Sequence, residues 1–486
     1  MYGLTVIIIL FNGGFMRKLL LLCFSFLLCT IFINAQPDGV QSTITSTPND
    51  TLNYINSGGG VLGVAGDGYV AGTNHLGHLG KYQRFDLSQG YLLKAFRVYI
   101  RVRELNAVPA DTLSFVVKTV NGDGTPGTTL TTIKKATDVL LSPNWNLFTL
   151  TSPLPIGKSI FIGCEWLSTV KDTFGIGSDL SGQGNGNGAH RAWEKWADGT
   201  YHAMDAANAW GSAYDIDLWI GAIAEKILPI SAARIDANAD LIPDRANDTL
   251  TVSGVVMCPN YQTVNRSYYI SDGTGGMSTF AYGLLSPALN LGDSIVIRGK
   301  LTQYNGLDEL TTITDNTIWV VGTNAKVMDP IVITPGTFNA TAEQNECQLI
   351  EIKGAWKIGG TWPALGTSVN DTITNGKDTL VMRIDSDTDI DGQPEPGWPK
   401  DVIGVLTQFA STGTYNTGYQ LQPRYYATDF LAVTPVELSS FSASVSSKSV
   451  MLNWSTATEK NNMGFEIQRS SDKVSFAKVG FINGNG

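Results

Sequence analysis

The chain has 486 residues, 43% of them hydrophobic and 10% aromatic, which is enough for several packed cores and excludes bulk disorder. Charged residues make up only 16% of the sequence, below the roughly one quarter that is usual, and glycine occurs 52 times. The formal net charge of −10 excludes a globally basic nucleic-acid-binding protein. This composition favours an extracellular all-β protein over a cytosolic enzyme.

A targeting segment opens the chain. Arg17 and Lys18 follow Met16, residues 19–33 form an apolar run, and Ala35 stands at a small-residue cleavage position. This pattern predicts a Sec signal peptide and is too short for a stable membrane span, so no span is expected in the mature chain. We interpret residues 1–15 as an upstream extension before the better start at Met16.

The cysteines of the mature chain are few and scattered. Cys164, Cys258 and Cys347 fall in different predicted segments and form neither a disulfide framework nor a CxxC metal motif. They are expected to be small buried hydrophobic residues.

Short runs with alternating hydrophobicity recur along the whole mature chain. Residues 350–353 and 380–384 are examples, and turn signals such as Asn305-Gly306 separate such runs. This spacing predicts an all-β fold of sandwiches and barrels. Residues 189–210 are predicted to form a hairpin with its turn at Asp198-Gly199.

The first mature region, residues 36–225, carries 13 basic and 17 acidic side chains. A domain at 48–225 has room for eight to ten short strands. Its Gly- and Asn-rich turn sequences at 68–74 and 121–127 resemble those of jelly-roll-like sandwiches in secreted, multi-domain bacterial surface proteins and peptidases. The resemblance implies a β-sandwich and says little about function.

The second region, residues 226–432, carries 13 basic and 22 acidic side chains and contains an internal repeat. Residues 293–304 and 401–409 both begin with an acid, continue through a β-branched strand, and end in Leu-Thr-Gln-aromatic. The pattern resembles two tandem OB-fold-type barrels, at about 245–325 and 345–432. Modules of this type accompany secreted nucleases and other exported bacterial proteins.

The third region has the most specific resemblance. Its segments 435–441, 452–459 and 461–470 resemble the fibronectin-type-III-like module that precedes the C-terminal sorting domain of type IX secretion cargo. The resemblance implies a secreted or cell-surface protein that uses the type IX secretion machinery. Only 52 residues follow Thr434, whereas such a sandwich needs about 90–100, so we interpret 435–486 as a truncated module.

Two acidic loops are candidate calcium sites. One spaces oxygen ligands at alternate positions, and the second places three aspartates ahead of Gly392. Alternate carboxylates on a tight loop can converge on one hard cation, although both loops lack the terminal bidentate acid of an EF-hand. The alternatives are a polar linker and a solvated insertion. The residues are Asp236, Asn238, Asp240 and Asp244 in the first loop, and Asp387, Asp389 and Asp391 in the second.

Aromatic side chains are the candidate ligand-binding residues. OB barrels bind across one strand face, where aromatic rings stack on sugars or bases. Core or rim packing is the favoured interpretation of these rings, stacking on a sugar or glycan is the alternative, and the acidic balance argues against nucleic acid. Six tyrosines fall near the expected faces: Tyr268, Tyr269, Tyr282, Tyr304, Tyr415 and Tyr419. In the first region, a carbohydrate platform or sandwich core would be built by Trp193, Trp196, Trp210 and Trp219.

No catalytic motif is present. The sequence contains no HExxH and no GxSxG, and the two-residue spacing of His75 and His78 is a weak zinc signal. We therefore predict an exported, non-catalytic surface binding or adhesion protein for a glycan or polymer. The alternatives are an accessory region of a larger secreted hydrolase, and an OB-fold nucleic-acid-binding protein.

Overall fold

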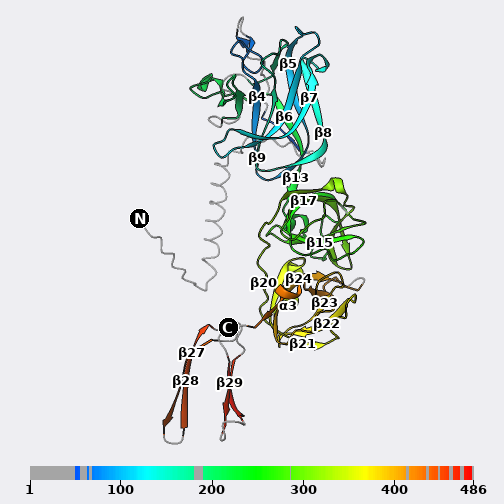
Figure 1. The fold of residues 1–486 in the computed structure, drawn as a ribbon, viewed down its shortest axis with the longest axis vertical. Helices are drawn as coiled ribbons and strands as arrows, with labels where there is room; N and C mark the ends of the chain where they lie inside the picture. Colours follow the sequence, from blue (N-terminus) through cyan, green and yellow to red (C-terminus); the bar gives the residue numbers. More distant parts are fainter. Residues whose placement is uncertain are drawn as a thin grey trace, which may run out of the picture. The chain divides into compact units, whose positions relative to one another are not determined.

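The fold is almost entirely β, which confirms the predicted class (Figure 1). The chain divides into two compact units, residues 1–88 with 93–224 and residues 89–92 with 225–486. The predicted signal peptide lies outside the described residues. A computed structural model describes residues 50–54, 63–64, 68–179, 190–284, 286–411, 415–433, 437–446, 449–458, 464–470 and 476–483.

The first unit is a sandwich of two sheets. One sheet has the strand order β12 (Tyr201–Ala203), β11 (Ala192–Lys195), β4 (Gly80–Asp86), β9 (Ser159–Glu165), β6 (Thr112–Val120) and β7 (Pro126–Ala136). In the other, β5 (Tyr91–Glu104) lies between β10 (Thr173–Ile176) and β13 (Ile220–Leu228), with β8 (Asn144–Ile156) paired to β5 and β1 (Asp50–Leu52) to β13. Shorter elements are β2 (Gly63–Val64), β3 (Gly68–Tyr69), η1 (Thr137–Val139) and η2 (Ser212–Tyr214).

Alternation along the strands builds the sandwich core. Phe96 of β5 and Phe148 of β8 turn inward, and their ring centroids lie 5.2 Å apart. Phe115 of β6, in the other sheet, stacks on Phe148 at 4.0 Å. Each such pair contributes about 0.5–1.5 kcal/mol beyond the area it buries, so this cluster helps to join the two layers.

The hairpin predicted for residues 189–210 is confirmed. Strand β11 pairs antiparallel with β12 and, on its other edge, with β4. In this register Glu194 lies opposite both His202 and Lys81.

The second unit contains two closed five-stranded barrels. In each, the first strand pairs with the second and fourth, and the third pairs parallel with the fifth, which is the connectivity of the OB fold. The first barrel consists of β14 (Thr249–Val256), β15 (Arg266–Ser271), β16 (Gly276–Ala281), β17 (Ser294–Tyr304) and β18 (Leu307–Thr311). The second consists of β21 (Leu349–Gly359), β22 (Val369–Thr374), β23 (Thr379–Ile384), β24 (Lys400–Gln408) and β25 (Tyr419–Gln422).

The sequence repeat corresponds to the fourth strand of each barrel, β17 and β24. Around them lie β19 (Ile318–Gly322), β20 (Ile331–Val332) and β26 (Phe430–Ala432), and the short helical turns α2 (Ile230–Ala233), α3 (Phe338–Thr341), α4 (Tyr426–Asp429), η3 (Asp315–Thr317) and η4 (Glu343–Asn345). Among the residues that the structure describes, no helix has the length and apolar character to cross a membrane.

The two barrels share part of their core. Leu349, Ile403 and Val405 of the second barrel belong to the buried cluster of the first. Tyr269 Oη donates to Thr407 Oγ1 at 2.8 Å, and Arg424 Nη1 donates to the carbonyl of Met257 at 3.0 Å. The tandem barrels are therefore joined by apolar packing and by buried polar contacts.

The three cysteines are free and fully buried, as predicted. Burial raises the pKa of the Cys258 thiol to about 12. Thiolate chemistry is therefore suppressed at that position.

The last region consists of two antiparallel hairpins. Strand β27 (Glu437–Ser446) pairs with β28 (Ser449–Thr458), and β29 (Gly464–Arg469) pairs with β30 (Ala477–Asn483). The fibronectin-type-III-like character of residues 435–486 stays a prediction.

Candidate functional site

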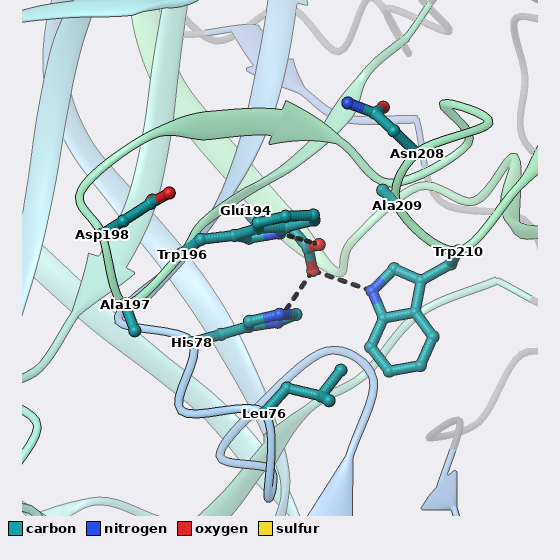
Figure 2. A pocket seen from close by; sticks show the side chains of 9 residues that line it. All are labelled: Leu76, His78, Glu194, Trp196, Ala197, Asp198, Asn208, Ala209 and Trp210. Atoms are coloured by element: carbon teal, nitrogen blue, oxygen red, sulfur yellow. Dashed lines mark hydrogen bonds and ion pairs between the residues drawn. The ribbon is translucent and has the colours of Figure 1, made fainter.

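A pocket of about 500 Å³ opens at the edge of the six-stranded sheet of the sandwich. Figure 2 shows its nine lining residues, which come from the segment before β4, from the β11–β12 hairpin and from the turns after it. These residues are Leu76, His78, Glu194, Trp196, Ala197, Asp198, Asn208, Ala209 and Trp210.

Glu194 forms the floor of the pocket and is completely buried. Its carboxylate accepts hydrogen bonds from Lys81 Nζ at 2.6 Å, Trp196 Nε1 at 2.6 Å and Trp210 Nε1 at 2.8 Å. His78 Nδ1 lies 3.1 Å from the same group (Figure 2). A buried carboxylate is tolerated when it is paired and fully hydrogen-bonded, and Lys81 supplies the compensating charge.

These contacts fix the charge of Glu194. Burial alone would raise its pKa, but hydrogen bonding to His78 and the charge and hydrogen bond of Lys81 lower the pKa to about 2. Glu194 is therefore ionised at neutral pH. A carboxylate in this state cannot donate a proton as a general acid, so we interpret it as a fixed acceptor.

The same carboxylate orients two indole rings. Trp196 lies parallel to His78, with an interplanar angle of 4°, and stacks on His202 at 3.8 Å between centroids. Trp210 stands almost perpendicular to His78, at 81° (Figure 2). The pocket therefore has two aromatic walls that meet at a steep angle and are held in place before any ligand binds.

The four tryptophans proposed as a carbohydrate platform lie in three different places in the structure. Trp193 is buried and contacts Phe161 in the core. Trp196 and Trp210 line the pocket, whereas Trp219 packs against Tyr99 on the other sheet. Core packing and pocket formation thus both occur within the same short segment.

The candidate tyrosines of the two barrels differ in their exposure to solvent. Tyr268, Tyr269 and Tyr419 are buried, and Tyr415 is half-buried. Because they are buried, the first three rings are not accessible to a ligand from solvent. Tyr282 and Tyr304 are exposed, at 86% and 59%.

The first acidic loop satisfies its own oxygens locally. Asp236 accepts from the backbone amides of Asp240 and Leu241, and Asp240 accepts from that of Ile242. Asn238 accepts from the amide of Asp240, and Asp244 from that of Ala237. These contacts are Asx-type turns that keep the loop compact.

The second acidic loop directs its carboxylates to three different segments. Asp387 accepts from Thr263 Oγ1, Asp389 from the amide of Tyr426, and Asp391 from the amide of Gly366. Within the described residues, no group of three or more His, Cys, Asp or Glu side chains is arranged to hold a metal ion.

The comparisons with known proteins give few matches. No family model matches the chain, and no curated protein matches it. A chain from a structure described as "Structural mimicry for functional antagonism" is 11% identical, with a TM-score of 0.19 over 35% of this chain and 87% of that one. The "p204 HINb domain" is 14% identical, with a TM-score of 0.19 over 37% of this chain and 95% of its own. TM-scores this low do not establish a shared fold.

Sequence reasoning missed the polar centre of the pocket. Lys81 and Glu194 are separated by more than a hundred residues, and each looks like an ordinary strand residue in its own segment. The available signal was the run Trp-Glu-Lys-Trp at residues 193–196, in which two charged residues lie between two tryptophans.

Proposed function

We propose that this protein is an exported, non-catalytic binding protein and that the pocket of its sandwich holds a neutral saccharide. The observation that carries the proposal is the pair of indole rings, Trp196 and Trp210, fixed at a steep angle by one buried carboxylate. Sugar rings present apolar C–H faces that pack on such rings, and pre-organised walls reduce the entropy that binding costs.

The pocket also offers polar groups for sugar hydroxyls. Asp198 and Asn208 lie at its edge and are exposed. A volume of about 500 Å³ lies within the range of small-molecule sites and suits one or two sugar rings. The Lys81–Glu194 pair cancels the charge at the floor, so the chemistry of the pocket favours an uncharged ligand.

Ligand titration of the full chain tests the proposal. Tryptophan fluorescence would be followed while cellopentaose, mannopentaose and chitopentaose are added separately. We expect at least one sugar to change the emission at concentrations up to about 10 mM, as weak single-site binding requires. Trp210→Ala should abolish the response.

The matched control is Trp356→Ala, which removes a 52%-exposed tryptophan from the second barrel. It should leave the titration unchanged. No response to any of the three sugars, or equal loss in both variants, would contradict the proposal.

Export is part of the same proposal. It rests on the signal-peptide pattern at residues 16–35 and on the resemblance of residues 435–486 to a type IX cargo module. Fractionation of a type IX-competent bacterium and of a secretion-deficient strain tests it. Protein on the surface only in the competent strain is the expected result.

The OB connectivity keeps a nucleic-acid-binding function as a second candidate. Its support is an exposed aromatic pair, Tyr304 and Phe409, with ring centroids 6.3 Å apart. The acidic balance of residues 226–432, with 13 basic and 22 acidic side chains, argues against nucleic-acid binding. Salt-sensitive binding of single-stranded DNA that Tyr304→Ala weakens would favour it.

A further inference from the structure

The outer face of the second sheet carries a strip of aromatic and basic side chains. Alternate residues of β5, namely Arg97, Tyr99 and Arg101, point away from the core. Trp145 of β8 and Trp219, which precedes β13, flank them. We call these five residues the β5 strip.

Ring contacts hold the strip together. Tyr99 meets Trp145 edge-on at 5.3 Å and Trp219 edge-on at 5.1 Å, measured between ring centroids. The Arg97 guanidinium lies 4.4 Å from the centre of the Trp145 ring. Trp219 is further fixed because its Nε1 donates to Asp179 Oδ1 at 3.0 Å.

Two glycines make room for this layer. A Cβ on Gly177 would lie 2.5 Å from the Trp219 ring and 3.1 Å from that of Tyr99. A Cβ on Gly221 would lie 3.1 Å from Arg97 Nε. The Trp219 ring, the Tyr99 ring and the Arg97 side chain therefore approach the backbone closely at these two glycines, where any larger residue would collide with them.

Two arginines give the β5 strip positive charge, and no carboxylate among the described residues pairs with either of them. Among the residues that the structure describes, Arg97 Nε is buried without a hydrogen-bond partner, and burial lowers the pKa of Arg97. Arg101 is exposed, and over the described ranges of the chain neither arginine forms an ion pair with a carboxylate. A partly desolvated guanidinium that has no carboxylate partner in the protein favours binding of an anionic group from a ligand.

We propose that the β5 strip is a second ligand site and that it binds an acidic polysaccharide, with carboxylates on the arginines and sugar rings on the aromatic residues. Arg97 and Arg101 are four strand residues apart, which is about 13 Å at the usual rise. That distance matches a few sugar units along one chain. The site differs from the neutral-saccharide pocket in position and in ligand charge, and does not depend on it.

Charge favours a polysaccharide over nucleic acid as the occupant. The strip has only two cations that form no ion pair with a carboxylate among the described residues, and residues 36–225 carry 13 basic against 17 acidic side chains. A groove that follows a phosphate backbone needs a longer basic track. A short site that binds the widely spaced carboxylates of an acidic polysaccharide needs only the two arginines.

The test compares polygalacturonate with its fully methyl-esterified form, which has the same backbone without the charge. Binding to the full chain would be measured by isothermal titration calorimetry at low salt. We expect polygalacturonate to bind, the ester to bind at least tenfold more weakly, and salt near 0.5 M to weaken the interaction.

Variants locate the site. Arg97→Gln with Arg101→Gln should lower the affinity at least tenfold, since each lost charge-assisted contact is worth about that factor. The control, Lys134→Gln with Lys135→Gln, removes the same charge from exposed positions on β7 and should change affinity less than about twofold. Arg101→Gln alone, at an exposed side chain, keeps the test decisive if the double variant misfolds.

Three results of the polygalacturonate experiments would overturn the proposal. These are no binding of polygalacturonate by the wild type, equal binding of its ester, and equal losses in both double variants. Tighter, Arg101-dependent binding of an oligothymidylate would also overturn it, in favour of nucleic acid. Trp210→Ala should leave polygalacturonate binding intact, so failure of the pocket proposal and failure of this one are distinguishable.

Discussion

The two units surround their buried charged side chains with opposite kinds of partner. In the sandwich, one carboxylate, Glu194, is surrounded by donors from Lys81 and two tryptophans. In the tandem barrels, one guanidinium, Arg234, is surrounded by carboxylates. Its Nε lies 2.9 Å from Asp308, and its Nη2 contacts Glu346 directly and lies 3.7 Å from Glu343.

The pKa values diverge accordingly. The pKa of Glu194 is lowered to about 2. Burial raises the pKa of Glu346 to about 8, and repulsion from Asp308 and Glu343 adds to burial while Arg234 opposes both. One oxygen of Glu346, Oε1, finds no hydrogen-bond partner in the described part of the chain. The ratio of donors to acceptors, more than burial itself, decides which buried acid stays charged.

Arg234→Ala should produce the largest effect. It leaves Asp308 buried without its cation and Glu346 without its hydrogen-bond donor, and removing one partner of a buried ion pair costs about 3–5 kcal/mol. Urea unfolding of the full chain measures the loss. Arg245→Ala, at an exposed pair with Asp248, should change the unfolding free energy by less than about 1 kcal/mol, and equal losses would refute the central role of Arg234.

Glu194→Gln should have the next largest effect. The amide keeps the shape but leaves Lys81 buried without a countercharge, so stability should fall by about 2–3 kcal/mol. Loss of the shared acceptor should also loosen Trp196 and Trp210 and weaken saccharide binding. Thermal unfolding and the sugar titration measure the two losses. Glu194→Gln with Lys81→Met should recover stability without recovering binding.

The pH dependence of stability should differ in sign between the two acids. The raised pKa of Glu346 means that its contribution is present below its ordinary value of 4.5 and is lost as pH rises through about 8. The lowered pKa of Glu194 means that its contribution is present above 4.5 and is lost as pH falls toward about 2.

Urea midpoints across this pH range measure both contributions. Glu346→Gln should flatten the loss of stability between about pH 5 and pH 8, and Glu194→Gln should flatten the loss below about pH 4.5. An unchanged pH profile in either variant would contradict the assignment for that residue.

Calcium removal should produce the smallest effect. Because the carboxylates of both acidic loops already accept protein hydrogen bonds, we expect the melting temperature with chelator to lie within about 1 °C of that with calcium. A rise of several degrees with calcium that Asp387→Ala removes would support the site predicted from sequence.

The sequence predicted the elements of the fold well, because alternation and turn signals are local. The runs at 350–353 and 380–384 lie in β21 and β23, and the turn at Asp198-Gly199 joins β11 to β12. The repeat ending in Tyr304 and Phe409 marked the fourth strand of each barrel. These features depend on residues a few positions apart.

The same reasoning failed to separate core from surface among aromatic residues. Tyr268 and Tyr282 look alike in sequence, yet the first is 3% and the second 86% exposed. Tyr268 lies within β15, whereas Tyr282 directly follows the last residue of β16. Where each strand ends depends on pairing partners that the local sequence does not reveal.

The sequence by itself determined the all-β class, the barrel repeat and the buried cysteines, since composition and short periodicity encode them. Only the tertiary structure decided the candidate sites. Lys81 meets Glu194 because β4 pairs with β11, and Arg97 lies over Gly221 because their strands share a sheet. Such contacts are set by strand pairing between distant segments, and no local pattern records which strands will pair.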